Sequence, residues 1–494
     1  MQAPSVSFVS LGCPKNLVDS EKMLGLLAEA GCPIVSSEVG RADVLVVNTC
    51  GFLAASREEA VEILRDAARQ KREGAFKRLV VAGCLVQRDG QGLLEQVPEI
   101  DALVGVHNRG DIVRAVMGDG HGLRERKSKQ RRGEKGPPAQ RDREGGAGTP
   151  DLFLGEYHPA SWIEANRSDQ VRLRLTPQHY AYLRMSEGCS QKCTFCTIPS
   201  IRGPLHSKGV EEILAEAREL IEDGAVELLL IGQDTTSYGR DIDYRPGLSG
   251  LLREMNRLEG IEWIRLMYAY PTDFTDDMIA AIAECDRVVK YIDLPLQHIN
   301  NRILRAMHRR VTREETELLL TKLRQRIPGV SIRTTFIAGF PGETEAELEE
   351  LRQYVSGFGF DAAGVFAYSN EPGTPSFRMQ DQLPPGLIQS RVQRLMLAQQ
   401  EVAFRKAAAH KGERLRVLID DFGRDGTYPA RHQGQAPEVD SMVHVEGGDL
   451  EPGQFAEVRC TGSRGYDLLA RAGGVNLPIF DGRSTTKTQR HKEE

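Results

Sequence analysis

Two long blocks of the chain alternate short apolar runs with amphipathic stretches, and this alternation limits the available folds more than any other feature. In residues 1–117 the apolar runs predict four strands, and the stretch after the first run ends on Gly31, a residue that commonly stops a helix. Strands separated by helices favour a parallel sheet, so we expect a doubly wound parallel α/β domain here. The four predicted strands are residues 6–11, 44–48, 79–82 and 102–105.

The alternation resumes in residues 176–410, where six apolar runs are each followed by a helical pattern. Six such units predict a partial or full parallel barrel, a (β/α)6 arrangement, with the chemistry at the carboxyl ends of its strands. The glycine-punctuated block 412–480 predicts a small antiparallel β-barrel, and residues 481–494 form a tail. The predicted strands are 182–186, 227–231, 263–267, 290–294, 331–338 and 364–367 in the second block and 415–419, 442–445 and 456–460 in the third.

Residues 118–175 are expected to be a charged insertion and linker between the first two domains. Residues 119–150 contain nine Lys or Arg, five Asp or Glu, seven Gly and three Pro, with almost no apolar side chains. Such a segment cannot bury enough surface to fold, so we interpret it as a flexible insertion. A basic arm that contacts RNA is the second interpretation.

The composition excludes several classes of protein. In 494 residues no apolar run approaches the roughly 20 residues that span a bilayer, and the start of the chain lacks the pattern of a secretory signal. We therefore expect a cytoplasmic protein with no membrane partner. The formal net charge of −6 provides no general attraction to nucleic acid.

The cysteines carry the strongest chemical signal. Nine cysteines are an odd number in a large chain, which disfavours a disulfide framework and favours metal or redox chemistry. Cys189, Cys193 and Cys196 lie in one short loop after the first predicted strand of the second block, a spacing that suits three corners of a cubane iron–sulfur cluster. A zinc knuckle or buried free thiols are the alternatives, but no fourth Cys or His follows Cys196 closely.

A second set of cysteines is spread along the first block. Cys13, Cys50 and Cys84 each come one or two residues after a predicted strand. Loops at the carboxyl ends of parallel strands converge, so these three thiols can meet and hold a second cluster with one free iron. The alternative is that each small Cys merely packs after its strand. The remaining Cys32, Cys285 and Cys460 are expected to be structural.

The loop with Cys189, Cys193 and Cys196 resembles that of the radical S-adenosylmethionine enzymes. In that family an aromatic residue, here Phe195, stands beside the last cysteine of the loop. The resemblance implies that the open iron binds S-adenosylmethionine and that cluster and cofactor together supply a 5′-deoxyadenosyl radical. It also implies cofactor contacts at the ends of the barrel strands, where single polar or glycine residues are equally consistent with ordinary turns. The candidate contacts are Phe195, Gln233 and Asp234 in IGQDTTSYG, Asp293 in DLPLQH, Arg333, and Gly339 in FIAGFPGET.

Both cysteine sets together, with the three folded blocks, resemble the methylthiotransferases over nearly the whole chain. That resemblance implies two 4Fe–4S clusters and a sulfur atom carried on the cluster at Cys13, Cys50 and Cys84. It also implies S-adenosylmethionine as both methyl donor and radical source. A radical is needed because an unactivated C–H bond has no proton that a side-chain base can remove. The last block then corresponds to a TRAM domain that recognises the substrate.

Within this family the chain resembles the RimO-type, protein-modifying branch. Pro14, Lys15 and Asn16 follow the first cysteine, where the tRNA-modifying branch has Gln-Met-Asn. The resemblance implies methylthiolation of the β-carbon of an aspartate in ribosomal protein S-twelve, free or in the small subunit. It also implies an electron donor of the flavodoxin or ferredoxin type and a sulfur donor, and we expect a monomer. Other matching stretches are LGCPKNLVDSE, NTCGF, AGCLVQ, IPSIRGP and RTTFIAGFPGET.

The charge of residues 412–480 supports a protein substrate. This block has seven Lys or Arg and eleven Asp or Glu, whereas a module that grips RNA is expected to be basic. An acidic module suits a basic ribosomal protein, although its charges also serve solubility alone. The alternatives are methylthiolation of an adenosine derivative beside the tRNA anticodon and, in a different class, a non-catalytic iron–sulfur electron carrier or ribosome-binding factor.

Overall fold

The structure, a computed structural model, describes residues 3–36, 42–118, 150–155, 168–423 and 426–476. Residues 119–149 of the expected insertion and the tail 481–494 lie outside these ranges. The chain divides into two compact units, and no helix of the described ranges is long and apolar enough to cross a membrane. The first unit contains Met1–Leu175, Arg184–Lys208 and Ser369–Met379, and the second contains Thr176–Leu183, Gly209–Tyr368 and Gln380–Glu494.

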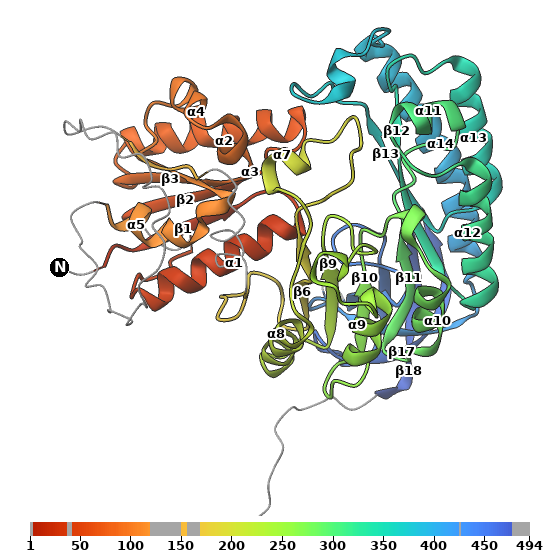
Figure 1. Ribbon diagram of the computed structural model, residues 1–494. Coiled ribbons are helices and arrows are strands. Elements are labelled where there is room, and N and C mark those ends of the chain that lie inside the picture. The colour runs from red at the N-terminus through yellow and green to blue at the C-terminus, as the bar shows by residue number, and fades with distance from the viewer. Residues whose placement is uncertain (1–2, 37–41, 119–149, 156–167, 424–425, 477–494) are drawn as a thin grey trace, which may run out of the picture. The chain divides into compact units, whose positions relative to one another are not determined.

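The first unit is built on a parallel sheet whose strand order, β1-β2-β3-β4-β5, follows the chain. Helices α1 and α5 bury apolar side chains on one face, while α2, α3 and α4 cover the other (Figure 1). The predicted parallel α/β class is confirmed. The strands are β1 (Val6–Ser10), β2 (Val44–Thr49), β3 (Arg78–Gly83), β4 (Ala102–Gly105) and β5 (Asp151–Phe153), and the helices are α1 (Pro14–Glu29), α2 (Ala54–Arg72), α3 (Cys84–Asp89), α4 (Gly92–Gln96) and α5 (Ile112–Met117).

The linker predicted at 118–175 is wrong for its residues 151–153. These residues form β5, which pairs in parallel with β4 from Ala102 to Val104. Three residues between charged and glycine-rich stretches carry too little periodicity to predict a strand. The strand forms because the free edge of β4 offers unpaired backbone groups.

The strand predicted at 182–186 is divided between two sheets. Its first part belongs to β6 (Tyr180–Arg184) in the large sheet, whereas β7 (Ser186–Glu187) pairs antiparallel with β8 (His206–Ser207). The β7–β8 pair closes a loop that carries Cys189, Cys193, Cys196 and the short helix α7 (Ile198–Arg202). Gly188 permits this closure, because a Cβ at that position would lie 2.0 Å from the Pro204 carbonyl oxygen.

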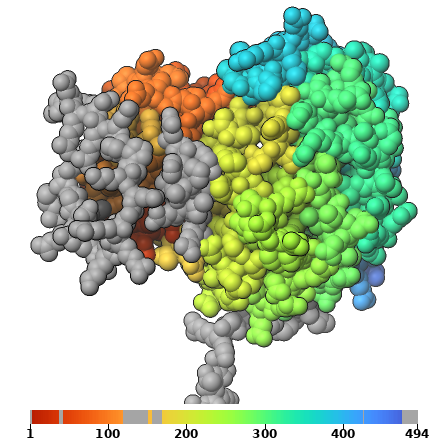
Figure 2. Space-filling model, in the orientation of Figure 1, coloured from red at the N-terminus to blue at the C-terminus, as the bar shows by residue number. Residues whose placement is uncertain are grey.

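The second unit is built on the sheet β13-β12-β11-β10-β9-β6, a partial barrel with helices outside it, as expected (Figure 1). In the space-filling view only a small part of the C-terminal block is visible on the face shown (Figure 2). The strands besides β6 are β9 (Glu227–Ile231), β10 (Trp263–Leu266), β11 (Val288–Asp293), β12 (Ser331–Ala338) and β13 (Ala362–Ala367), and the helices are α8 (Val210–Glu222), α9 (Gly247–Met255), α10 (Asp276–Glu284), α11 (Asn301–Ala306), α12 (Arg313–Arg326), α13 (Glu345–Phe358) and α14 (Pro385–Ala409).

The C-terminal block forms a closed five-stranded barrel in the order β14-β15-β16-β18-β17. The predicted barrel is confirmed, but one pair, β16 with β18, is parallel. A ring with an odd number of strands cannot alternate direction throughout, so at least one neighbouring pair must be parallel. The strands are β14 (Arg414–Ile419), β15 (Thr427–His432), β16 (Val443–Glu446), β17 (Phe455–Arg464) and β18 (Asp467–Asn476).

Candidate cluster-binding site

Three strand ends bring the first cysteine set together. Cys13 follows β1 by three residues, Cys50 follows β2 directly, and Cys84 is the first residue of α3 after β3. Because β1, β2 and β3 are parallel neighbours, their carboxyl ends lie at one edge of the sheet. Residues that are 37 and 34 positions apart in sequence are thereby gathered in one place.

Glycines beside the cysteines allow the loops to approach closely. A Cβ on Gly12 would lie 2.8 Å from the Cβ of Cys50, and one on Gly51 would lie 2.7 Å from the backbone of Cys84. Gly83 has a φ of +102°, and a Cβ there would lie 2.2 Å from Oδ1 of Asn48. Any side chain at these three positions would force the loops apart.

The environments of Cys50 and Cys84 favour neutral thiols until a metal binds. Burial raises the pKa of Cys84 to about 11 and also raises the pKa of Cys50, and the charge of Cys13 contributes to both increases. The Arg202 guanidinium acts in the opposite direction, since Nη2 donates a hydrogen bond to Cys84 Sγ at 3.1 Å. The thiols are thus near enough to influence one another, and metal loading would release their protons.

Three soft sulfur donors at one sheet edge suit an iron–sulfur cluster, and three thiolates leave one iron of a cubane without a protein ligand. Within the described part of the chain, no three His, Cys, Asp or Glu side chains are arranged to hold a metal ion. A cluster makes a different demand, because its thiolates bind separate irons.

The second cysteine set lies in the same unit, in the loop closed by β7 and β8. Cys189 is buried, and its N–H donates to the Gly203 carbonyl oxygen at 3.1 Å. Cys193 and Cys196 are half-buried, and the Ile198 N–H at the start of α7 donates to Cys196 Sγ at 3.5 Å. Backbone donors to sulfur of this kind stabilise a thiolate.

The short helix α7 connects the two sets. Cys196 lies two residues before α7, and Arg202 is its last residue. Ile201 packs against Cys84 and Val106, so α7 rests on the edge that carries the first set. At about 1.5 Å per residue, the helix is roughly 8 Å long.

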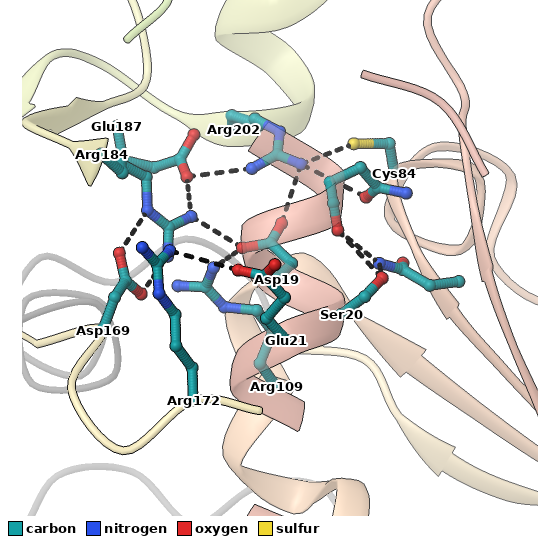
Figure 3. A network of polar contacts seen from close by, with 12 residues as sticks. Asp19, Ser20, Glu21, Cys84, Arg109, Asp169, Arg172, Arg184, Glu187 and Arg202 are labelled. Atoms are coloured by element: carbon teal, nitrogen blue, oxygen red, sulfur yellow. Dashed lines mark hydrogen bonds and ion pairs between the residues drawn. The ribbon is translucent and has the colours of Figure 1, made fainter. Parts of the chain in front are cut away.

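A buried ionic network fixes the loop of the second set to α1 (Figure 3). Arg184 contacts Asp19 at 2.7 Å, Glu187 at 2.6 Å and Asp169 at 2.5 Å. Arg202 contacts the same Asp19 and Glu187, both at 2.9 Å. These side chains are at most 3% exposed, so each charge depends on its partners for stabilisation.

The prediction of site residues missed this network. Arg202 lies inside IPSIRGP and Asp19 inside LGCPKNLVDSE, two stretches used only to identify the family. The available signal was a charged residue beside buried apolar positions on a short helix. Arg202 and Asp19 lie 183 positions apart in the sequence, so no local pattern indicates that they pair.

Two of the expected cofactor contacts form a charge pair in the second unit. Asp293 is fully buried, accepts from Arg333 at 2.8 Å and accepts from the Tyr268 N–H at 3.0 Å. Arg333 is half-buried and also contacts Asp440, from the loop between β15 and β16, at 3.3 Å. The TRAM-like barrel therefore helps to orient Arg333.

The other expected contacts have mixed surroundings. Asp234 is buried and accepts from the hydroxyls of Thr236 at 2.8 Å and Ser237 at 2.7 Å, which is a local turn arrangement. Gly339 has a φ of +83°, and a Cβ there would lie 2.6 Å from Ile388, so packing alone explains this glycine. Gln233 and Phe195 are half-buried.

Comparison with known proteins places the three folded blocks. A sequence model of the Radical SAM superfamily matches residues 183–355, one described as uncharacterized protein family UPF0004 matches residues 5–105, and the TRAM domain matches residues 412–472. The structure of the radical S-adenosylmethionine methyltransferase TsrM from Kitasatospora setae aligns with a TM-score of 0.51 at 15% identity, covering 84% of this chain and 79% of that one, which is a likeness of fold. Fold and sequence models together define a radical S-adenosylmethionine enzyme, a class that uses an iron–sulfur cluster and S-adenosylmethionine.

Full-length relatives narrow this class. The ribosomal protein uS12 methylthiotransferase RimO of Pelotomaculum thermopropionicum is 41% identical over 471 residues, covering 94% of this chain and 98% of the relative. The protein of the same name from Symbiobacterium thermophilum is 42% identical over 472 residues, covering 94% and 90%. The chain belongs to the RimO family of methylthiotransferases, which confirms the resemblance found in the sequence.

Proposed function

We propose that this enzyme transfers a methylthio group to the β-carbon of an aspartate of ribosomal protein uS12, the protein after which its relatives are named. The observation that carries the chemistry is that two sets of three cysteines belong to one compact unit, one at adjacent strand ends and one in a single loop. The relationship over 94% of the chain carries the choice of substrate.

Each set of thiols has its own role in this proposal. Cys189, Cys193 and Cys196 bind the radical-generating 4Fe–4S cluster, and the set at positions 13, 50 and 84 binds the sulfur-carrying one. When bound, the two clusters and S-adenosylmethionine supply the 5′-deoxyadenosyl radical and the methylated sulfur. The chain contributes three thiolates for each cluster and an open iron position in each.

The polar residues of the second unit divide into contacts and supports. Gln233, two residues after β9, and Arg333, inside β12 and not at its end as expected, are half-buried and are our candidates for contacts with S-adenosylmethionine. Asp293 orients Arg333, and Asp234 shapes its own turn. Phe195 stays a candidate contact from the loop of the second set, whereas Gly339 is better explained by packing.

The charge of the TRAM-like barrel gives weaker support for a protein substrate than the composition of residues 412–480 suggests. Asp420 pairs with Arg431 at 2.7 Å, Asp440 accepts from the Tyr291 hydroxyl at 2.7 Å, and Glu438 accepts from two tyrosine hydroxyls. These carboxylates bind partners within the second unit. In the described part of the barrel, exposed acidic side chains only slightly outnumber exposed basic ones.

Partners follow from the reaction. Reductive cleavage of S-adenosylmethionine needs a one-electron donor of the flavodoxin or ferredoxin type, and the inserted sulfur needs a donor. We propose that the enzyme acts in the cytoplasm, as a monomer, on uS12 alone or within the small subunit.

One competition experiment tests the substrate. The enzyme is reconstituted anaerobically and given S-adenosylmethionine, a reductant, sulfide, a uS12 loop peptide and an anticodon stem-loop together, and both products are read by mass spectrometry. A methylthio mass on the peptide aspartate alone is expected. The same mass on the RNA alone would overturn the protein substrate, and cofactor cleavage with neither product modified would reject both.

A further inference from the structure

One arginine from the loop of the second cysteine set reaches a sulfur of the first set. Arg202 Nη2 donates a hydrogen bond to Cys84 Sγ at 3.1 Å (Figure 3). The Arg202 side chain is 1% exposed, so water does not screen its charge from the sulfur.

Two carboxylates hold this guanidinium in place. Asp19, on α1, accepts from Nη2 at 2.9 Å, and Glu187, on β7, accepts from Nη1 at 2.9 Å. A planar guanidinium bound on two sides cannot rotate away from its third partner. Arg202 therefore points at Cys84 whether or not other groups occupy the site.

A fixed cation that donates to a cluster sulfur has a defined electronic effect. Hydrogen bonds to sulfur and nearby positive charge favour the reduced, more negative state of an iron–sulfur cluster. We propose that Arg202 is a positioning residue that orients the Cys84 thiolate and raises the reduction potential of the cluster at the first set. This inference rests on the proposed function, which places a cluster at Cys13, Cys50 and Cys84.

The same network contains a matched control. Arg184 is also 1% exposed and contacts the same Asp19 and Glu187, but the charge it carries is directed to Asp169 instead of Cys84. In an Arg202→Met variant both carboxylates keep Arg184, and in an Arg184→Met variant both keep Arg202. The two substitutions thus remove similar buried ion pairs, and only one removes the contact with sulfur.

The experiment isolates the first cluster in the full-length chain. Cys189, Cys193 and Cys196 are replaced together by Ala, so that only the first set can bind iron. Arg202→Met, Arg202→Lys and Arg184→Met are then introduced separately, and each protein is reconstituted. Iron content and a potentiometric titration followed by electron paramagnetic resonance are recorded, without any need for turnover.

We expect the midpoint potential to move to more negative values in Arg202→Met, with iron retained, and to move much less in Arg202→Lys because the positive charge stays. Arg184→Met is expected to shift the potential much less, because Arg184 donates to Asp169 and not to the sulfur of Cys84. Equal potentials in Arg202→Met and its parent, or equal shifts in Arg202→Met and Arg184→Met, would overturn the inference and leave Arg202 a structural residue.

Two further outcomes are distinguishable. No iron in the parent protein would mean that the first set binds no cluster, so the proposed function would fail with the inference. If Arg202→Met does not fold, Arg202→Gln, which removes the charge and keeps a hydrogen-bond donor, decides in its place: a more negative midpoint potential at unchanged iron content supports the role, and an unchanged potential contradicts it.

Discussion

The two cysteine sets of this protein are built in opposite ways. Cys189, Cys193 and Cys196 come from eight consecutive residues that a two-stranded pair and one short helix hold together. Cys13, Cys50 and Cys84 come from three strand ends and meet only when the sheet has formed. One set depends mainly on local turns, and the other depends on the whole fold of its domain.

This difference makes the two cysteine sets unequally sensitive to changes in the sheet. The loop that carries Cys189, Cys193 and Cys196 can tolerate changes elsewhere in the sheet. The positions of Cys13, Cys50 and Cys84, in contrast, depend on how the strands pack. The two are nevertheless coupled, since Arg202 and α7 connect the loop of one set to Cys84 of the other.

Removing each set entirely gives the largest expected effect. Replacing Cys13, Cys50 and Cys84 by Ala is expected to abolish methylthio transfer while cleavage of S-adenosylmethionine continues. Replacing the cysteines of the loop set is expected to abolish both, and each triple variant keeps about half of the iron of the parent. Iron analysis and chromatography of the cleavage product provide the measurement. Loss of both activities in the first variant would contradict separate roles.

A glycine beside Cys84 tests how strongly the first cysteine set depends on close packing of its loops. Gly83→Ala combines a positive φ with a close approach to Asn48, so we expect about 3 kcal/mol of destabilisation and loss of iron from the first set. Gly74 has a φ of +82° but nothing within 4 Å, so Gly74→Ala isolates the backbone effect at about 1 kcal/mol. Urea unfolding of the iron-free proteins measures both.

The loop set has its own counterpart at Gly188. Gly188→Ala is expected to lower iron binding at Cys189, Cys193 and Cys196 while the first set keeps its cluster, because the clash with Pro204 lies inside the loop. Iron lost from both sets in either glycine variant would show that the sets do not form independently.

The fold was predictable where local pattern and topology agree. The strand at 227–231, which is β9, was predicted to the residue, because it is a continuous buried run between turns. The strand at 182–186 was not, because its end is recruited by β8, twenty residues along the chain. The three residues of β5 were missed because edge pairing, and not their own pattern, makes them a strand.

The candidate site shows the same limit. Both cysteine sets were found in the sequence, one by spacing and one by assuming a parallel sheet. Arg202 and Asp19 were missed as site residues, because a buried ion pair leaves no periodic trace and its members lie far apart in sequence. Glu371, whose contacts lie on α2 and α3, was missed for the same reason.

Glu371 belongs to a segment that contacts the surroundings of both cysteine sets. Its side chain is 1% exposed and contacts Arg57 at 2.5 Å and Arg88 at 2.8 Å, and a few residues further on the Ser376 N–H donates to the Thr194 carbonyl oxygen in the loop set. Glu371→Gln leaves two half-buried arginines without their buried carboxylate, so we expect about 2 kcal/mol of destabilisation at pH 7.

The pH dependence of this effect has a definite sign. Burial alone would raise the pKa of Glu371, but hydrogen bonds from Ser369, Arg57 and Arg88 outweigh it and lower the pKa below the ordinary value of 4.5. The stabilisation is therefore complete above pH 4.5 and is lost as the pH falls below it. Urea unfolding at several pH values is expected to show parent and variant converging in acid. Glu99→Gln, at the partly exposed pair with Arg72, is the control and is expected to cost less than about 1 kcal/mol.

The smallest effect is expected where neither cysteine set is touched. Glu446, Asp449 and Glu451 are exposed on or beside the C-terminal barrel. If they attract a basic substrate, replacing all three by Lys weakens binding of a uS12 peptide by about tenfold, since three exposed charges at about 0.5 kcal/mol each total about 1.5 kcal/mol and salt screens them. Titration calorimetry at two salt concentrations measures this, with the exposed Glu58, Glu59 and Glu62 on α2 replaced by Lys as the control for an equal change in net charge. An equal loss in both variants would assign the effect to total charge, and tighter binding of an anticodon stem-loop without a change for the peptide would show that the barrel's carboxylates act against RNA and not for the protein substrate.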